Sequence, residues 1–253
     1  MTSASRADIC IIGASHVAAV KLAYDRLVDL GTQVPSVHFL ARGGEGFRAI
    51  KAMPDGIMLR GPSGGARRTE PVIGYGSCKA FVVYGTARLD GALVAANGLE
   101  VPGAYPRTYC EGVLAALLAV NSSMTLARTI AKRSGKPTYL LAAPLYARAP
   151  DLAEASDKAW PRLVATAQAT CAAAGVTFLP QPSETIEGGT HTHPAFARGL
   201  EEMGSLTRME NDVKHMNVDY GGLVLDAIFA ATGVVATKSL STRQRSLRPP
   251  RRA

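Results

Sequence analysis

Three residue types that together can hydrolyse an ester lie near opposite ends of the chain. Ser15 comes two residues after the continuous apolar run 8–13 and opens a helical stretch, in Gly13-Ala14-Ser15-His16. A serine in such a turn exposes its hydroxyl at a sheet edge and sets its own amide at a positive helix N-terminus. An acyl-transfer nucleophile uses both features. A serine that simply caps the helix would give the same local pattern.

The second group is Asp212-Val213-Lys214-His215, just before the last helical stretch. An Asp three residues before a His lets the carboxylate and the imidazole share one turn. The carboxylate then orients the ring, and the other ring nitrogen is left to take a proton from a serine. A surface turn would also contain this spacing. Its position, on the loop entering a C-terminal helix, favours a catalytic role for Asp212 and His215.

The elements between these two groups predict a parallel sheet covered by helices. Apolar runs typical of strands buried on both faces alternate with stretches of helical spacing. The architecture expected is a three-layer α/β/α sandwich, flavodoxin-like, in which sites form at the carboxyl ends of the strands. The expected strands are 8–13, 36–41, 80–85, 138–143 and 176–179.

The remaining segments complete this architecture. Turn signals around two short apolar runs predict a small β-hairpin insertion over residues 50–76. A loop of roughly thirty residues is expected before the last helix, and no internal repeat is present. The helices are expected over 16–30, 108–134, 152–174 and 220–231.

Both chemical groups, in this order of elements, resemble the SGNH (GDSL-like) hydrolases. Gly13-Ala14-Ser15-His16 is similar to the family's first block, and Asp212-Val213-Lys214-His215 to its last. The resemblance extends to about Ala231. It implies a flavodoxin-like sandwich and hydrolysis of a carboxylic ester, such as an O-acetyl or other O-acyl group. It also implies that Ser15 is the nucleophile, His215 the general base and Asp212 its orienting residue.

The chain departs from this family pattern where the oxyanion is stabilised. Ala14 stands where many members have Asp, and Ala87 replaces the asparagine of the third block, in Gly85-Thr86-Ala87-Arg88. Loss of one oxyanion donor costs on the order of 3 kcal/mol of transition-state stabilisation. The expected donors are backbone amides or, as an alternative, the side chain of Arg88. His16, Arg88 and Asn217 are the expected substrate contacts. The expected oxyanion donors are Ser15, Gly43, Gly44 and Gly85.

Two other functions remain possible. The missing asparagine motivates a catalytically silent binding module for a glycan or an acylated partner. A helix N-terminus at Ser15 would also suit phosphate or nucleotide. A dinucleotide-binding oxidoreductase is disfavoured because the Gly-x-Gly-x-x-Gly spacing is absent. His191 and His193 share a face of an extended segment, but two histidines leave a zinc site half-built, so neither metal nor cofactor is expected.

The amino-acid composition limits the possible domain organisation, partners and cellular location of the protein. The formal charge is +8, but six of the 28 basic residues lie in 238–253, which leaves 22 basic against 20 acidic residues. We therefore expect one hydrolase domain over 1–237, a basic, disordered tail over 238–253, and no nucleic-acid partner. The four cysteines form no Cys-x-x-Cys pair, and the N-terminus reads as neither a signal peptide nor a membrane span. A cytoplasmic enzyme acting on a small-molecule or carbohydrate ester is expected, and its oligomeric state is left open.

Overall fold

A computed structural model gives the structure of the chain. It describes residues 7–59, 73–85, 89, 107–147, 159–197 and 212–234. The side chains of residues 44, 45, 107, 110, 114 and 159 are excepted. The expected substrate contact Arg88 and the predicted disordered tail 238–253 lie outside the described residues, as does the altered third-block position Ala87.

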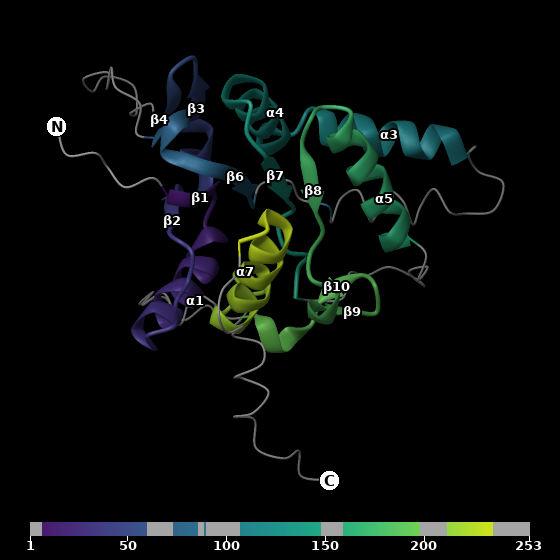
Figure 1. Cartoon of the computed structure of the whole chain (residues 1–253). Coiled ribbons are helices and arrows are strands. Elements are labelled where there is room, and N and C mark those ends of the chain that lie inside the picture. The colour runs from purple at the N-terminus through teal and green to yellow at the C-terminus, as the bar shows by residue number, and fades with distance from the viewer. Residues whose placement is uncertain are drawn as a thin grey trace, which may run out of the picture.

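The central sheet has five parallel strands in the order β2-β1-β6-β7-β8 (Figure 1). This is the predicted sheet, and each strand begins and ends within two residues of its predicted bounds. Since β1 pairs with both β2 and β6, its carboxyl end lies between the ends of two neighbouring strands. The bounds are β1 Ala7–Gly13, β2 Val37–Ala41, β6 Cys78–Tyr84, β7 Thr138–Leu141 and β8 Thr177–Leu179.

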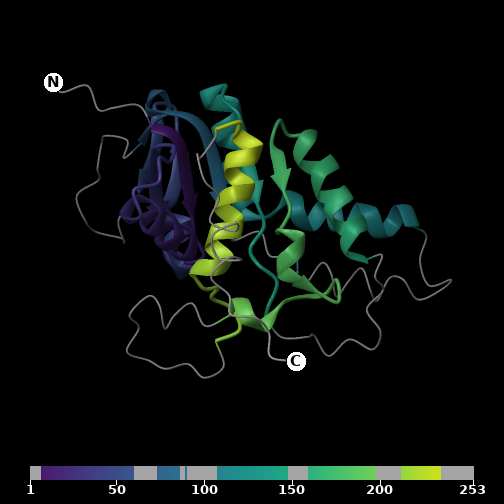
Figure 2. The same ribbon diagram turned by 60° about the horizontal axis from the view of Figure 1, so that its bottom comes forward.

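Helices cover both faces of this sheet, which confirms the predicted three-layer α/β/α architecture (Figures 1 and 2). Alternate residues of β1 point to opposite faces. Ile9 and Ile11 join the core beneath α1 and α7, whereas Cys10 and Ile12 join the core beneath α4 and α5. The helices are α1 Val17–Asp29, α3 Arg107–Ala119, α4 Ser122–Ser134, α5 Ala159–Ala172 and α7 Val218–Thr232.

The single long helix predicted over 108–134 is wrong, because the chain breaks into α3 and α4. Asn121 adopts an extended backbone conformation, and its side chain accepts a hydrogen bond from the amide of Ser123 (2.8 Å). A capping asparagine satisfies a free amide at the start of a new helix, which stabilises the break. The apolar periodicity continues across this break and therefore does not reveal it.

Among the described residues, no single helix is long and apolar enough to cross a membrane. The bent pair of α3 and α4 reaches that length and apolar character only when the two helices are taken together.

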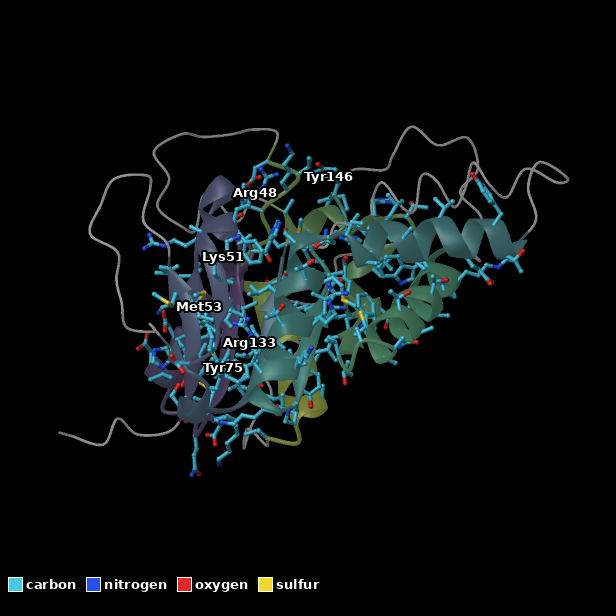
Figure 3. All side chains as sticks on the ribbon, turned by 90° about the horizontal axis from the view of Figure 1, so that it is seen from above. Arg48, Lys51, Met53, Tyr75, Arg133 and Tyr146 are labelled. Atoms are coloured by element: carbon cyan, nitrogen blue, oxygen red, sulfur yellow. The ribbon has the colours of Figure 1, made fainter. Side chains whose placement is uncertain are left out.

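The predicted hairpin insertion is present as a three-stranded antiparallel sheet. Its strands are β3 Ile50–Met53, β4 Gly56–Leu59 and β5 Ile73–Gly74. The Tyr75 hydroxyl donates to the Met53 carbonyl (2.7 Å), and the Arg133 guanidinium of α4 donates to the Ala52 carbonyl (2.7 Å; Figure 3). These bonds tie the small sheet to itself and to α4.

The long loop predicted before the last helix contains structure of its own. It folds into a short antiparallel hairpin of β9 Ile186–Glu187 and β10 His191–Thr192, flanked by two 3₁₀ turns. In Figure 1 this hairpin lies beyond the carboxyl end of β8. It therefore stands beside the edge of the sheet at which Ser15 is placed.

Helices α1 and α7 lie side by side and cross in direct backbone contact. A Cβ atom added at Gly221 of α7 would lie 2.1 Å from the carbonyl oxygen of Ala19 in α1. No side chain fits at that distance, so glycine is required where the two helices meet. Because α1 begins just after Ser15 and α7 just after His215, this crossing fixes the separation of the two loops that carry the predicted chemistry.

The variant Gly221→Ala tests this contact. The added methyl group must push α7 away from α1, and overpacking of this kind costs about 1–3 kcal/mol of unfolding free energy. Urea unfolding followed by circular dichroism measures that loss. The matched control is Gly112→Ala in α3, where nothing lies within 4 Å of the added Cβ. There alanine is expected to stabilise the helix by about 0.5–1 kcal/mol. Equal effects of the two variants would contradict the packing argument.

Candidate functional site

Ser15 lies on a tight turn between β1 and α1. A Cβ at Gly13 would lie 2.0 Å from the Tyr84 carbonyl oxygen, so only glycine lets β1 end this close to β6. The Ala14 amide then donates to that carbonyl (3.2 Å), and the Val17 amide donates to the Ala14 carbonyl (3.1 Å). This turn leaves Ser15 half-buried at the carboxyl end of β1, the place expected from the sequence.

Asp212 and His215 form the pair that their spacing predicts. The Nδ1 atom of His215 lies 2.9 Å from Oδ1 of Asp212, and the same oxygen accepts the backbone amide of His215 (3.1 Å). The Asp212 side chain is only 4% exposed, whereas that of His215 is 24% exposed. A buried carboxylate that holds Nδ1 leaves Nε2 as the nitrogen available for proton transfer.

His16 brings the two ends of the chain together. Its ring centroid lies 6.0 Å from that of His215 and 6.2 Å from that of Tyr84. His16, an expected substrate contact, is buried, 9% exposed, and packs against Gly85. Gly85 has a φ of +99°, and a Cβ there would lie 3.2 Å from Cδ2 of His16. The imidazole of His215 therefore lies next to the residue that follows Ser15.

Among the residues that the structure describes, the Ser15 hydroxyl makes no hydrogen bond. Catalytic hydrogen bonds are often long in the absence of substrate and tighten when it binds. The contact between His16 and His215 places the imidazole in the neighbourhood of Ser15. The serine–histidine bond itself stays a prediction.

The amides expected to stabilise an oxyanion differ in their availability. The Gly85 amide donates to the Leu141 carbonyl (3.4 Å), so it takes part in the sheet. In the described part of the chain the amides of Ser15 and Gly43 make no backbone hydrogen bond, and the space around Gly43 is open. Ser15 and Gly43 are thus the better donors, whereas Gly44 stays a prediction.

Two buried tyrosines lie beneath the histidines. Tyr84, the last residue of β6, and Tyr220, in the first turn of α7, are fully buried. Burial raises the pKa of the Tyr84 phenol, and the nearby Tyr220 lowers it by a smaller amount. Burial also raises the pKa of Tyr220 well above its usual value, and Tyr84 adds to that shift. Both phenols stay protonated at neutral pH, so this layer adds no charge beneath His16.

Asn217 holds the start of α7 in place. Its side-chain oxygen accepts the Tyr220 amide (3.1 Å), and its side-chain nitrogen donates to the Ala195 carbonyl (2.8 Å). Its own amide donates to the Phe196 carbonyl (2.9 Å). These bonds join the His215 loop to the segment after β10 and give Asn217 a positioning role. Its predicted contact with substrate stays a prediction.

A buried polar network that the sequence did not reveal supports the same loops. Gln181 is 3% exposed; its oxygen accepts the Leu145 amide (2.9 Å), and its nitrogen donates to the hydroxyls of Thr185 and Thr192 (both 2.9 Å). The Thr192 hydroxyl in turn donates to the Leu145 carbonyl (2.7 Å). Gln181 stands between two prolines, outside any periodic pattern, so nothing in the sequence marks it as buried.

The same network fixes the loop that carries Asp212. The Ala147 amide, two residues after Leu145, donates to the Val213 carbonyl (2.9 Å). The ends of β7 and β8, the hairpin β9–β10 and the His215 loop are therefore one connected unit.

The two loop histidines have partners other than a metal. His191 lies 3.3 Å from the carboxylate of Glu187, and the Nδ1 atom of His193 accepts the Ala195 amide (3.1 Å). Within the described ranges, no group of three or more His, Cys, Asp or Glu side chains is placed to hold a metal ion.

The strand order and the two-sided helix cover define a flavodoxin-like α/β/α protein. No family model matches the chain. No curated protein matches it either.

Among solved structures, the chain is similar to LAE5, an α/β hydrolase enzyme from the metagenome of Lake Arreo, Spain. The match covers 91% of this chain and 97% of that chain, with 15% sequence identity and a TM-score of 0.39. A likeness at this level carries no argument about the reaction, so function has to be argued from the site itself.

The variant Gln181→Met tests the buried network. Methionine fills a similar volume but leaves the buried Leu145 amide without its acceptor, and an unsatisfied buried group costs about 1–3 kcal/mol. It also removes the hydrogen bonds that the Thr185 and Thr192 hydroxyls accept, although both hydroxyls still donate to backbone carbonyls. We expect a lower urea midpoint and faster amide hydrogen exchange at Leu145 and Thr192. Gln168→Met is the matched control, because Gln168 is exposed on α5. A Gln181 variant as stable as this control would show that the network contributes little.

Proposed function

We propose that the protein is a serine hydrolase that cleaves a carboxylic ester, in the manner of the SGNH hydrolases. The observation that carries the proposal is the hydrogen-bonded pair of Asp212 and His215, with the His215 ring 6.0 Å from the ring of His16, the residue after Ser15. A nucleophile, a base and an orienting carboxylate drawn from two ends of a chain are the parts that ester hydrolysis needs.

In the proposed reaction the Ser15 hydroxyl attacks the carbonyl carbon of the ester while Nε2 of His215 takes its proton. The amides of Ser15 and Gly43 bind the oxyanion that forms. The tetrahedral intermediate collapses, the alcohol leaves with the proton from His215, and the acyl group stays on Ser15. Water, deprotonated by His215, then attacks the acyl carbon, and the acid leaves as His215 returns the proton to the Ser15 oxygen. Throughout, Asp212 stabilises the imidazolium form of His215.

The variant Ser15→Ala tests the nucleophile. Without the hydroxyl there is no acyl-enzyme, so turnover of 4-nitrophenyl acetate is expected to fall by roughly a thousandfold or more. The release of 4-nitrophenol measures it, and circular dichroism checks that the variant is folded. Turnover equal to that of the unaltered protein would remove Ser15 from the mechanism.

The variant Asp212→Asn tests the orienting carboxylate. An asparagine oxygen can still accept the His215 backbone amide, so the loop should keep its shape. It cannot support the imidazolium or favour the required tautomer, and kcat is expected to fall by about 10²–10⁴-fold. Steady-state kinetics on the same ester give kcat directly. A variant with full kcat would show that Asp212 only stabilises the loop and takes no part in catalysis.

A catalytically silent binding module is the second candidate function. Ala87 stands where the SGNH pattern has its oxyanion asparagine, which favours this alternative. A fluorophosphonate probe distinguishes the two, because it forms a covalent adduct only with an activated serine. An adduct at Ser15, located by mass spectrometry, supports the hydrolase; a folded but unlabelled protein supports the binding module.

A further inference from the structure

Two cationic residues lie in segments next to the proposed site. Arg42 directly follows β2, the neighbour of β1 on one side, and its backbone amide donates to the Gly13 carbonyl (2.9 Å). Lys214 precedes His215, and its ammonium lies over the ring of Tyr146. Tyr146, labelled in Figure 3, belongs to the loop that follows β7. One cationic residue is thus next to the strand that leads to Ser15, and the other is next to the proposed base.

Arg42 is held at this position but its charge is not neutralised. Its side chain is exposed, and its aliphatic stem rests against Gly46, where an added Cβ would lie 3.3 Å from Cβ of Arg42. Across the described ranges the guanidinium forms no ion pair. The stem contact restrains the side chain near the sheet edge, and the charge faces solvent.

Lys214 is restrained in a different way. Its ammonium lies 5.7 Å from the centroid of the Tyr146 ring, a cation–π contact, and its backbone amide donates to Asp212 (3.4 Å). Asp212 is the nearest acidic residue in sequence, but its carboxylate is buried and bound to His215. In the part of the chain that the structure describes, Lys214 makes no ion pair, so its charge is available to a ligand.

Both cations are close in the chain to the residues of the proposed reaction. Arg42 is bound through its amide to Gly13, two residues before Ser15, and Lys214 directly precedes His215. Both side chains are long and exposed. We therefore expect a negative group on an ester bound at Ser15 to come within reach of one or both charges.

We propose that the substrate is an anionic ester, one that carries a carboxylate or another negative group, and that Arg42 and Lys214 bind that group. This inference rests on the proposed hydrolase function and adds the charge of its substrate. Cations in a cleft raise the local concentration of an anionic substrate and its rate of association, and salt weakens both effects.

The test compares esters that differ in charge and little else. 4-Acetoxybenzoate carries the charge on the alcohol part, and 4-acetoxybenzamide is its neutral partner. 4-Nitrophenyl hemiadipate carries the charge on the acyl part, and 4-nitrophenyl hexanoate is its neutral partner. The quantity measured is the ratio of kcat/KM between the anionic and the neutral member of each pair, and the pair with the higher ratio tells which part of the substrate is charged.

We expect the ratio to exceed one in at least one pair and to fall as salt is raised from 20 to 500 mM. The variants Arg42→Met and Lys214→Met keep the apolar stem and remove the charge. Each should lower the ratio by about twofold to fivefold, the range expected for partly exposed charges. The matched control is Lys132→Met. Lys132 is exposed near the end of α4, which leads into the start of β7, so it lies toward the opposite edge of the sheet. This control should leave kcat/KM unchanged for both the anionic and the neutral ester.

A binding measurement keeps the two proposals separate. In the Ser15→Ala background the esters stay intact, and calorimetry compares the Kd of each anionic ester with that of its neutral partner. Ratios near one in both kinetics and binding, or ratios that the Arg42 and Lys214 variants leave unchanged, overturn the charge proposal even if every ester is hydrolysed. Tighter anion binding without any turnover supports the charge proposal and counts against the hydrolase.

Discussion

The site depends on the close crossing of α1 and α7. Gly221 lets the backbone of α7 approach the Ala19 carbonyl so closely that no side chain fits between them. The first helix begins after Ser15 and the last after His215, so one contact between helices sets the distance between residues two hundred positions apart in sequence. The fully buried Tyr84 and Tyr220 pack beneath this junction, which gives His16 and His215 a rigid and uncharged support.

A second constraint acts from the other side of the His215 loop. Gln181 binds the loop after β7 to the hairpin β9–β10, and Asn217 binds the start of α7 to the residues that follow the hairpin. Buried polar groups with satisfied hydrogen bonds hold a backbone in one arrangement, because any displacement leaves several of them unpaired. The Asp212–His215 pair is thus supported by packing on one side and by hydrogen bonds on the other.

Charge is distributed around this frame in a way that bears on specificity. The Asp212 carboxylate is buried and bound to His215, whereas the cations of Arg42 and Lys214 face solvent. In the proposed site, the uncharged Tyr84 and Tyr220 together with the exposed cations of Arg42 and Lys214 favour the binding of an anionic group near Ser15. The overall charge of the sequence hides this pattern, since much of the excess of basic residues lies beyond Thr237.

The sequence by itself determined the α/β/α class, the five strands, Ser15 at the end of the first strand, and the Asp212–His215 pair. Continuous apolar runs and a three-residue spacing are local signals, so they can be recognised without a partner. The break at Asn121, the burial of His16, the network around Gln181 and the need for glycine at 221 were decided only by the tertiary structure. Each of these depends on which groups another segment supplies: a helix backbone at Gly221, two threonines at Gln181, the ring of His215 at His16. Local composition carries no record of those partners, because long-range contacts form only when the chain has folded.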